Sequence, residues 1–286
     1  MVARTGESVS ESIADRAGSG AGEPAAASVP PAPPHPRGEV IRAVAFDCYG
    51  TLLDFDERAF APAIDGLLRD HGATHTDGKT VWKAWMAHAR AHGKQHGRDP
   101  DNPLTGPEPR FFSFAESWTA HFEAAFSEAQ VEGIAARDAT EFLFDLLGQA
   151  PPYDEVRQVL DGLRSRGLRI AVASNADDAH LNPALDRHGI RELVDTVISS
   201  EGVRSYKPRR PFFDAIEAWS GVTAAEVAYV GDSPYADVTG SRSVGMASYW
   251  VRRYEDEERE KLLHHEPTWR FSDLCGLLDV LTGAAS

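Results

Sequence analysis

Six short apolar runs are spaced along the chain after residue 40, and most of them end in polar residues. They read IRAVAFD, LRIAVASN, VDTVISS, EVAYVGDS, MASYWV and TWRFSD. Because apolar residues follow one another in these runs without polar alternation, we predict strands that are buried on both faces. Stretches of helical character, such as RPFFDAIEAWSG, lie between them. This alternation predicts an α/β fold in which helices cover both sides of a parallel sheet.

A long segment interrupts the alternation between Phe55 and Pro151. It contains helical patterns such as KTVWKAWMAHARAHGK and FFSFAESWTAHFEAAFSEA, and no convincing strand. An insert of this length is too long for a loop inside a compact domain. We therefore predict an all-helical domain at residues 56–150, sitting over the sheet of a core domain made from residues 39–55 and 151–286.

Residues 1–38 differ in composition from the rest of the chain. They are rich in Ala, Ser, Gly, Pro and Glu and include the run SVPPAPPHPRG. Such a segment buries too little apolar surface to offset the entropy lost on ordering. We therefore expect a disordered N-terminal extension.

Composition and charge restrict the classes of partner. The chain has 286 residues, of which 42% are hydrophobic, and a formal net charge of −15. Binding to nucleic acid or to an anionic membrane is electrostatically unfavourable for an acidic protein. We therefore expect a small diffusible substrate as the main partner. No apolar run approaches the ~20 residues that a membrane span needs. The two cysteines, Cys48 and Cys275, do not form a disulfide framework, which predicts a cytoplasmic location. The oligomeric state stays open.

Polar side chains stand at the ends of several predicted strands. Asp47, Ser174 with Asn175, and Asp232 each follow an apolar run, and Lys207 lies in the loop after another. In an open parallel sheet, ligands bind outside the carboxyl ends of the strands. We therefore expect these four stretches of chain to converge on one site.

The residue types at this expected site suggest a chemistry. A carboxylate can act as a nucleophile through a covalent aspartyl intermediate. If the target is a phosphate, two carboxylates facing that anion need a divalent cation, and Mg²⁺ bound by carboxylates is the usual choice. Lys207 and the Ser174 hydroxyl would then hold the oxygens on which charge develops.

Four stretches together resemble the haloacid dehalogenase superfamily of aspartyl-nucleophile hydrolases. They are FDCYGTLLD, VASNAD, SYKPRRPFF and YVGDSPYAD, and they occur in the order of that family. The resemblance extends from about Ile41 to Leu281. It implies a Rossmann-like sheet sandwiched by helices, with a helical cap inserted between the first and second motifs.

The resemblance also implies roles for individual residues. Asp47 would be the nucleophile, Ser174 a phosphate ligand and Lys207 a charge clamp. Asp232 would bind the metal with Asp237 in support, and the main-chain carbonyl of Tyr49 would complete the protein ligands. The expected catalytic group is Asp47, Ser174, Asn175 and Lys207, the substrate-binding group is Tyr49, Thr51, Ser174 and Lys207, and the metal group is Asp47, Tyr49, Asp232 and Asp237.

Two branches of the superfamily fit different parts of the sequence. Its phosphatases generally carry an aspartate two residues after the nucleophile, where it protonates the leaving group, but this chain has Tyr49 there. A tyrosine in the form DxYGT is typical of the 2-haloacid dehalogenases, whose halide leaving group needs no proton and which work without metal. Those dehalogenases usually lack the acidic pair that GDSPYAD retains here. Without a cation, that pair would repel an anionic substrate.

The helical insert gives one further comparison. Dehalogenases usually place an arginine after a tryptophan in the first long cap helix, whereas this chain has Lys83 after Trp82. A lysine cannot reproduce the bidentate pairing of arginine with a carboxylate. We therefore favour Mg²⁺-dependent hydrolysis of a small-molecule phosphate ester. Metal-independent 2-haloacid dehalogenation is the alternative, and a non-catalytic binding module is a more remote one.

Overall fold

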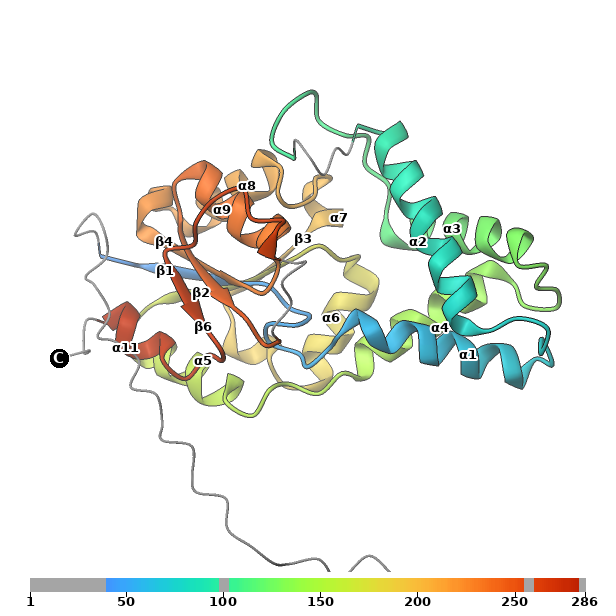
Figure 1. Cartoon of the computed structure of the whole chain (residues 1–286). Helices are drawn as coiled ribbons and strands as arrows, with labels where there is room; N and C mark the ends of the chain where they lie inside the picture. The colour runs from blue at the N-terminus through green and yellow to red at the C-terminus, as the bar shows by residue number, and fades with distance from the viewer. Residues whose placement is uncertain (1–39, 98–102, 255–259, 283–286) are drawn as a thin grey trace, which may run out of the picture. The chain divides into compact units, whose positions relative to one another are not determined.

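A six-stranded parallel sheet forms the centre of the computed structural model, which describes residues 40–97, 103–254 and 260–282 (Figure 1). The strand order is β3-β2-β1-β4-β5-β6, and every neighbouring pair is parallel. All six predicted strands are confirmed. Their bounds are Ala43–Phe46 (β1), Arg169–Ser174 (β2), Thr196–Ser199 (β3), Val227–Gly231 (β4), Ala247–Val251 (β5) and Trp269–Phe271 (β6). The predicted N-terminal extension lies outside the described residues.

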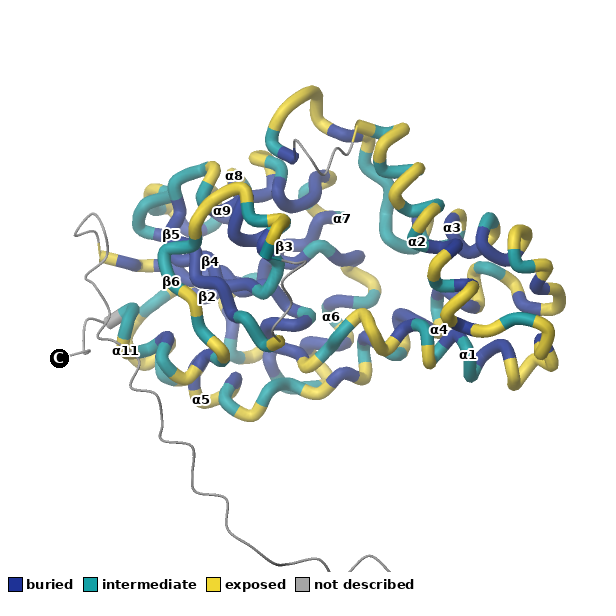
Figure 2. Tube along the Cα trace, in the orientation of Figure 1, coloured by how far each residue is buried: buried dark blue, intermediate teal, exposed yellow. Residues whose placement is uncertain are grey.

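Helices cover both faces of the sheet, as the sequence predicts. Alternate residues of β1 point to opposite faces, so Val44 and Phe46 join one hydrophobic cluster and Ala43 and Ala45 another. The first cluster contains apolar side chains of α5 (Val156–Ser165), α6 (Asp178–Arg187) and α11 (Leu277–Thr282). The second contains those of α8 (Arg210–Ser220), with Val244 of α9 (Thr239–Val244) packed against it. The central strands are therefore buried on both sides (Figure 2).

Short helical segments connect these elements. α7 spans Ser200–Val203, and a π-helix spans Pro234–Val238 directly after β4. Three 3₁₀ turns span Glu57–Ala59, Arg191–Leu193 and Ala224–Glu226. The π-helix is relevant to the site, because it carries Asp237 back toward the end of β4.

Four helices follow one another in the segment between β1 and β2. They are α1 (Phe60–Asp70), α2 (Gly78–Gln95), α3 (Phe114–Glu128) and α4 (Ala136–Gln149). They share a hydrophobic cluster of their own, in which Trp85 stacks on Trp82 and meets Trp118 edge to face. We call residues 57–149 the helical insert. The insert lies within the expected residues 56–150, and its independence as a domain stays a prediction.

Core side chains hold the helical insert at two places. The Asp177 carboxylate accepts hydrogen bonds from the backbone amides of Phe114 and Ala115, at the start of α3. The guanidinium of Arg209 donates to the backbone carbonyls of residues 103, 105, 106 and 107. The insert is thus tied to the residues that flank Asn175 and Lys207. Within the described segments, no helix combines the length and the apolar character that a bilayer crossing requires.

Candidate active site

Asp47 is the first residue after β1, where the chain turns sharply. Its backbone amide still pairs with the Val230 carbonyl of β4, which fixes its position at the sheet edge. The carbonyl of Cys48 then accepts hydrogen bonds from the amides of residues 51, 52 and 53, and Gly50 adopts a φ of +81°. A β-carbon is strained at such a φ, so glycine is needed in this turn. The turn leaves the Asp47 side chain at the carboxyl end of the sheet, only 7% exposed.

The Lys207 ammonium is buried among oxygen atoms from four residues. Its Nζ lies 2.6 Å from Asp47 Oδ1, 2.7 Å from Asp237 Oδ1, 2.8 Å from the Tyr229 hydroxyl and 3.2 Å from the Ala173 carbonyl. Burial lowers the pKa of Lys207, but the carboxylates of Asp237 and Asp47 raise it more, so the pKa lies above its usual value. Lys207 therefore remains charged and acts as the counter-ion of both aspartates.

Asn175 and Ser174 support this arrangement from the end of β2. The Asn175 amide oxygen accepts from the backbone N–H of Lys207 at 2.8 Å, and its NH₂ donates to the Lys207 carbonyl at 3.2 Å. The Ser174 hydroxyl donates to Asp47 Oδ1 at 3.1 Å. Asn175 thus holds the backbone of Lys207, while Ser174 contacts the candidate nucleophile itself.

Three carboxylates gather within this small volume. Ligand oxygens of Asp47, Asp232 and Asp237 lie within 4.8 Å of one another. The pKa of Asp47 is raised to about 7. Burial is the largest cause of this rise; the Lys207 ammonium lowers the pKa, and the carboxylates of Asp237 and Asp232 raise it. A second cation near these carboxylates would keep Asp47 ionised at neutral pH.

The backbone of the first motif lies directly against Asp232. A β-carbon added to Gly50 would lie 2.8 Å from Asp232 Oδ2, which is closer than such contacts normally allow. The Thr51 hydroxyl donates to Asp232 Oδ1 over 3.4 Å. This approach brings the peptide that joins Tyr49 to Gly50 close to the three carboxylates. Carboxylate and carbonyl oxygens are ligands that Mg²⁺ accepts, so the residues present fit that ion.

Most of the expected site residues meet in one place. The structure brings together Asp47, Thr51, Ser174, Lys207, Asp232 and Asp237. Asp237 also accepts from the Ser233 amide at 2.9 Å, so it stabilises the loop after β4 as well as pairing with Lys207. The Tyr49 ring packs against Phe55 and lines a neighbouring pocket.

Three residues that the sequence reasoning missed also support the site. The fully buried Tyr229 hydroxyl accepts from Lys207 and lies 2.8 Å from the Ala173 carbonyl, to which it can donate. The Trp250 indole donates to the Asp232 carbonyl at 2.9 Å, and Arg253 donates to the Thr51 carbonyl at 2.8 Å. The only sequence signal for Tyr229 is a hydroxyl within an otherwise apolar buried strand.

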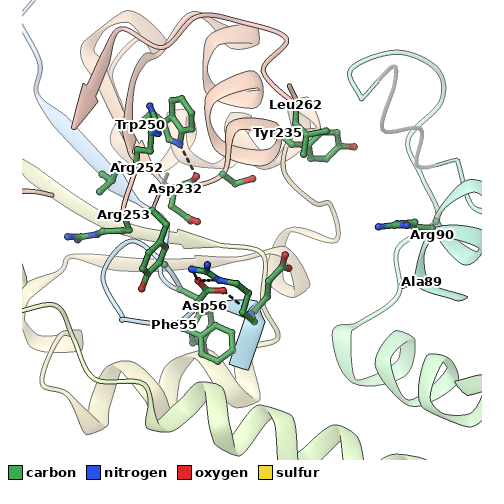
Figure 3. A pocket seen from close by; sticks show the side chains of 18 of the residues that line it. Phe55, Asp56, Ala89, Arg90, Asp232, Tyr235, Trp250, Arg252, Arg253 and Leu262 are labelled. Atoms are coloured by element: carbon green, nitrogen blue, oxygen red, sulfur yellow. Dashed lines mark hydrogen bonds and ion pairs between the residues drawn. The ribbon is translucent and has the colours of Figure 1, made fainter. Parts of the chain in front are cut away.

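A pocket of about 1130 Å³ opens beside these carboxylates (Figure 3). Tyr49, Gly50 and Asp232 line it on the core side, and residues 89–91, 93 and 94 of α2 line it on the side of the helical insert. Lys83, which follows Trp82 where dehalogenases usually carry an arginine, is exposed and does not line this pocket. A small molecule in the pocket would therefore contact both the core and the insert.

The chain is similar to both dehalogenases and phosphatases among known proteins. The chain is 25% identical over 223 residues to haloacetate dehalogenase H-2 of Moraxella sp. (strain B), covering 75% of this chain and 87% of that protein. It is 27% identical over 215 residues to phosphatase MT3486 of Mycobacterium tuberculosis, covering 74% and 88%. The crystal structure of the HAD hydrolase YfnB from Bacillus subtilis, bound to magnesium, superposes with a TM-score of 0.65 at 18% identity, over 85% of this chain and 100% of that one.

A family model settles the class of protein. The model described as haloacid dehalogenase-like hydrolase matches residues 41–245, which include every site residue expected from the sequence. The fold, the order of the motifs and this match agree, and the chain therefore belongs to the haloacid dehalogenase-like hydrolases.

Proposed function

We propose that this hydrolase cleaves small-molecule phosphate esters in a Mg²⁺-dependent reaction that uses Asp47 as the nucleophile. The observation that carries the proposal is the charge balance of the site. Asp47, Asp232 and Asp237 lie within 4.8 Å of one another, and Lys207 forms ion pairs with Asp47 and Asp237. Carboxylates gathered this closely repel an anionic substrate, so we infer that a divalent cation binds among them when the substrate is a phosphate.

The arrangement around Asp47 selects one of its oxygens. Oδ1 accepts from Lys207 and from Ser174, which leaves Oδ2 as the oxygen that attacks phosphorus. As the P–Oδ2 bond forms, the bond to the leaving oxygen breaks and that oxygen takes the electron pair. Water then attacks the phosphorus of the aspartyl-phosphate, which releases phosphate and regenerates the Asp47 carboxylate. A bound Mg²⁺ would neutralise the carboxylates that face the phosphoryl oxygens.

Tyr49 restricts the leaving group. It stands where phosphatases of this superfamily carry the acid that protonates the leaving oxygen. Burial raises the pKa of the Tyr49 phenol, which makes it a poor proton donor at neutral pH. We therefore infer that the preferred substrates have leaving groups that need little protonation, such as acyl or anomeric phosphates.

Dehalogenation is the second candidate, and Tyr49 is the observation that favours it. In that reaction, Asp47 displaces a halide from carbon and water hydrolyses the resulting ester, so no leaving-group acid is needed. The similarity to haloacetate dehalogenase H-2 supports the same possibility. Against it stands Asp232, whose charge beside Asp47 opposes the approach of a carboxylate substrate when no cation is bound.

One set of assays separates the candidates. Phosphate release from acetyl phosphate and glucose 1-phosphate is measured with Mg²⁺ and with EDTA, and halide release is measured from fluoroacetate and 2-chloropropionate. The proposal predicts phosphate release that EDTA and Asp47→Asn both abolish. Halide release that EDTA leaves unchanged would establish dehalogenation instead. Absence of both activities would support the non-catalytic binding module.

A further inference from the structure

Helix α2 carries an unusual concentration of positive charge for this protein. It contains Lys79, Lys83, Arg90 and Lys94 and has no Asp or Glu, although the whole chain has a net charge of −15. At 3.6 residues per turn, these four positions fall within an arc of about 60°. All four are exposed. Together they form one cationic stripe along the helix, which we call the α2 stripe.

Only the C-terminal half of the α2 stripe reaches the pocket. Arg90 and Lys94 line it, whereas Lys79 and Lys83 do not. The opposite wall contains Gly50 and Asp232, beside the candidate nucleophile. In Figure 3 the Arg90 side chain extends from α2 toward the side of the pocket on which Asp232 lies. The pocket thus has Asp232, which lies close to Asp47, at one end and two cations at the other.

The other cations that line the pocket are already paired. Arg58 is bound to Asp56, Arg252 lies 2.7 Å from Glu260, and Arg253 lies 2.6 Å from Glu155. Across residues 40–97, 103–254 and 260–282, by contrast, neither Arg90 nor Lys94 forms an ion pair or a side-chain hydrogen bond. These two cations can therefore pair with an incoming anion without first giving up a carboxylate of the described residues.

The size of the pocket indicates what kind of anion this is. At about 1130 Å³ the pocket exceeds the roughly 300–1,000 Å³ typical of sites for drug-sized ligands. A phosphoryl group held at Asp47 would leave most of this volume to the rest of the substrate. A substrate that reached from the core wall to α2 would meet Arg90 and Lys94 at its far end.

We propose that Arg90 and Lys94 bind a second anionic group of the substrate, so that the substrate class is organic phosphates with a carboxylate or a second phosphate remote from the scissile bond. This inference rests on the proposed phosphatase function. The two residues set specificity and take no part in the bond-breaking steps. They also draw an anion into a site on a protein whose net charge is −15.

Three sugar phosphates with the same anomeric phosphate test this inference. Glucose 1-phosphate has no second anion, glucuronic acid 1-phosphate adds a carboxylate, and glucose 1,6-bisphosphate adds a phosphate. Comparing the last two identifies which anion the site prefers. The test variant is Arg90→Gln/Lys94→Gln. Its control is Lys79→Gln/Lys83→Gln, which removes the same charge from the same stripe of the same helix but outside the pocket.

The expected result is a selective change in KM. The test variant should raise KM at least about tenfold for one or both substrates that carry a second anion, which corresponds to losing about 1.4 kcal/mol of binding. Its kcat and its activity on glucose 1-phosphate should change less than twofold, and the control should behave like the parent. An equal loss in the control, or an equal loss on glucose 1-phosphate, would overturn the inference, as would no change at all.

A binding measurement separates this inference from the proposed function. Calorimetry on Asp47→Asn protein, which cannot turn over substrate, gives the affinity for glucose 1-phosphate, glucuronic acid 1-phosphate and glucose 1,6-bisphosphate in the presence of Mg²⁺. We expect one or both substrates with a second anion to bind more tightly than glucose 1-phosphate, and the added Arg90→Gln/Lys94→Gln change to remove that difference. If the parent hydrolyses neither acetyl phosphate nor these sugars, the phosphatase proposal fails by itself. Equal affinity for all three sugars in Asp47→Asn protein would overturn the second-anion site in either case.

Discussion

Lys207 Nζ lies 2.6 Å from Asp47 Oδ1, although 160 positions separate the two residues in the chain. The lysine and the aspartate are both nearly inaccessible to solvent. The same ammonium pairs with Asp237 at 2.7 Å. One buried cation thus compensates two buried carboxylates, which makes Lys207 important for stability as well as for chemistry.

Lys207→Gln should therefore reduce both stability and activity. The variant leaves two buried carboxylates unpaired, which costs about 3–5 kcal/mol of unfolding free energy. Loss of a charged donor at the reacting group should lower kcat at least about 100-fold. Urea unfolding and steady-state kinetics measure the two effects, and exposed Lys79→Gln serves as the surface control. Unchanged stability of Lys207→Gln would contradict the buried pairing.

Tyr229→Phe tests the hydroxyl that holds Lys207 in place. Removing it takes away an acceptor of the ammonium and a partner of the Ala173 carbonyl, which should destabilise the protein by about 1–3 kcal/mol. Because the phenol lies behind Lys207, we expect kcat to fall while KM stays unchanged. Tyr249→Phe is the matched control, since Tyr249 is buried on the neighbouring strand and packs in the hydrophobic cluster of the other face. Equal kinetic effects of the two variants would argue against a positioning role for Tyr229.

Gly50→Ala separates backbone strain from the close approach to Asp232. Gly50 and Gly72 have similar φ values, +81° and +75°, so alanine should cost about 1–2 kcal/mol of backbone strain at either position. A β-carbon at Gly72 meets nothing within 4 Å, whereas one at Gly50 lies 2.8 Å from Asp232 Oδ2. We expect Gly50→Ala alone to lose Mg²⁺-dependent turnover, although thermal unfolding shows both variants destabilised. Full activity of Gly50→Ala would show that the site tolerates displacement of Asp232.

The Glu155–Arg253 pair predicts a pH dependence of stability. Burial raises the pKa of Glu155, but hydrogen bonds from Arg253 and from the Leu274 amide outweigh it and hold the pKa below its ordinary value of 4.5. Because the folded protein favours the ionised form, the stabilisation is complete above pH 4.5 and is lost as the pH falls through the lowered pKa. Arg253 also holds the Thr51 carbonyl, so the pair supports the turn after Asp47.

Glu155→Gln should accordingly lower the melting temperature at pH 7, and the difference from the parent should shrink as the solution is acidified below pH 4.5. Thermal unfolding from pH 3 to pH 8 measures this dependence. Glu266→Gln is the control, because its ion pair with Arg270 is largely exposed and contributes little. A deficit in Glu155→Gln that stays constant across this range would contradict the ionic contribution.

The sequence by itself determined the strands and their polar ends. Each of the six apolar runs forms a strand of the sheet. The side chains of an unbroken apolar run point to both faces of a strand, so they are removed from water only where both faces are covered. Asp47, Ser174 and Asp232 could be selected because each interrupts such a run at the end where parallel strands bind ligands. These signals are local, so they can be read without knowing which strands are neighbours.

The tertiary structure decided which side chains meet. The sheet order places β1 between β2 and β4, which brings Ala173 and Tyr229 to the same buried ammonium; no local pattern in the sequence specifies that order. No local pattern shows that the Asn175 amide holds the Lys207 backbone. Nor does a local pattern show that only Arg90 and Lys94 of the α2 stripe reach the pocket. Hydrophobic periodicity indicates whether a residue is buried, but it does not indicate which residues it packs against. Those contacts depend on packing between segments that are far apart in the chain.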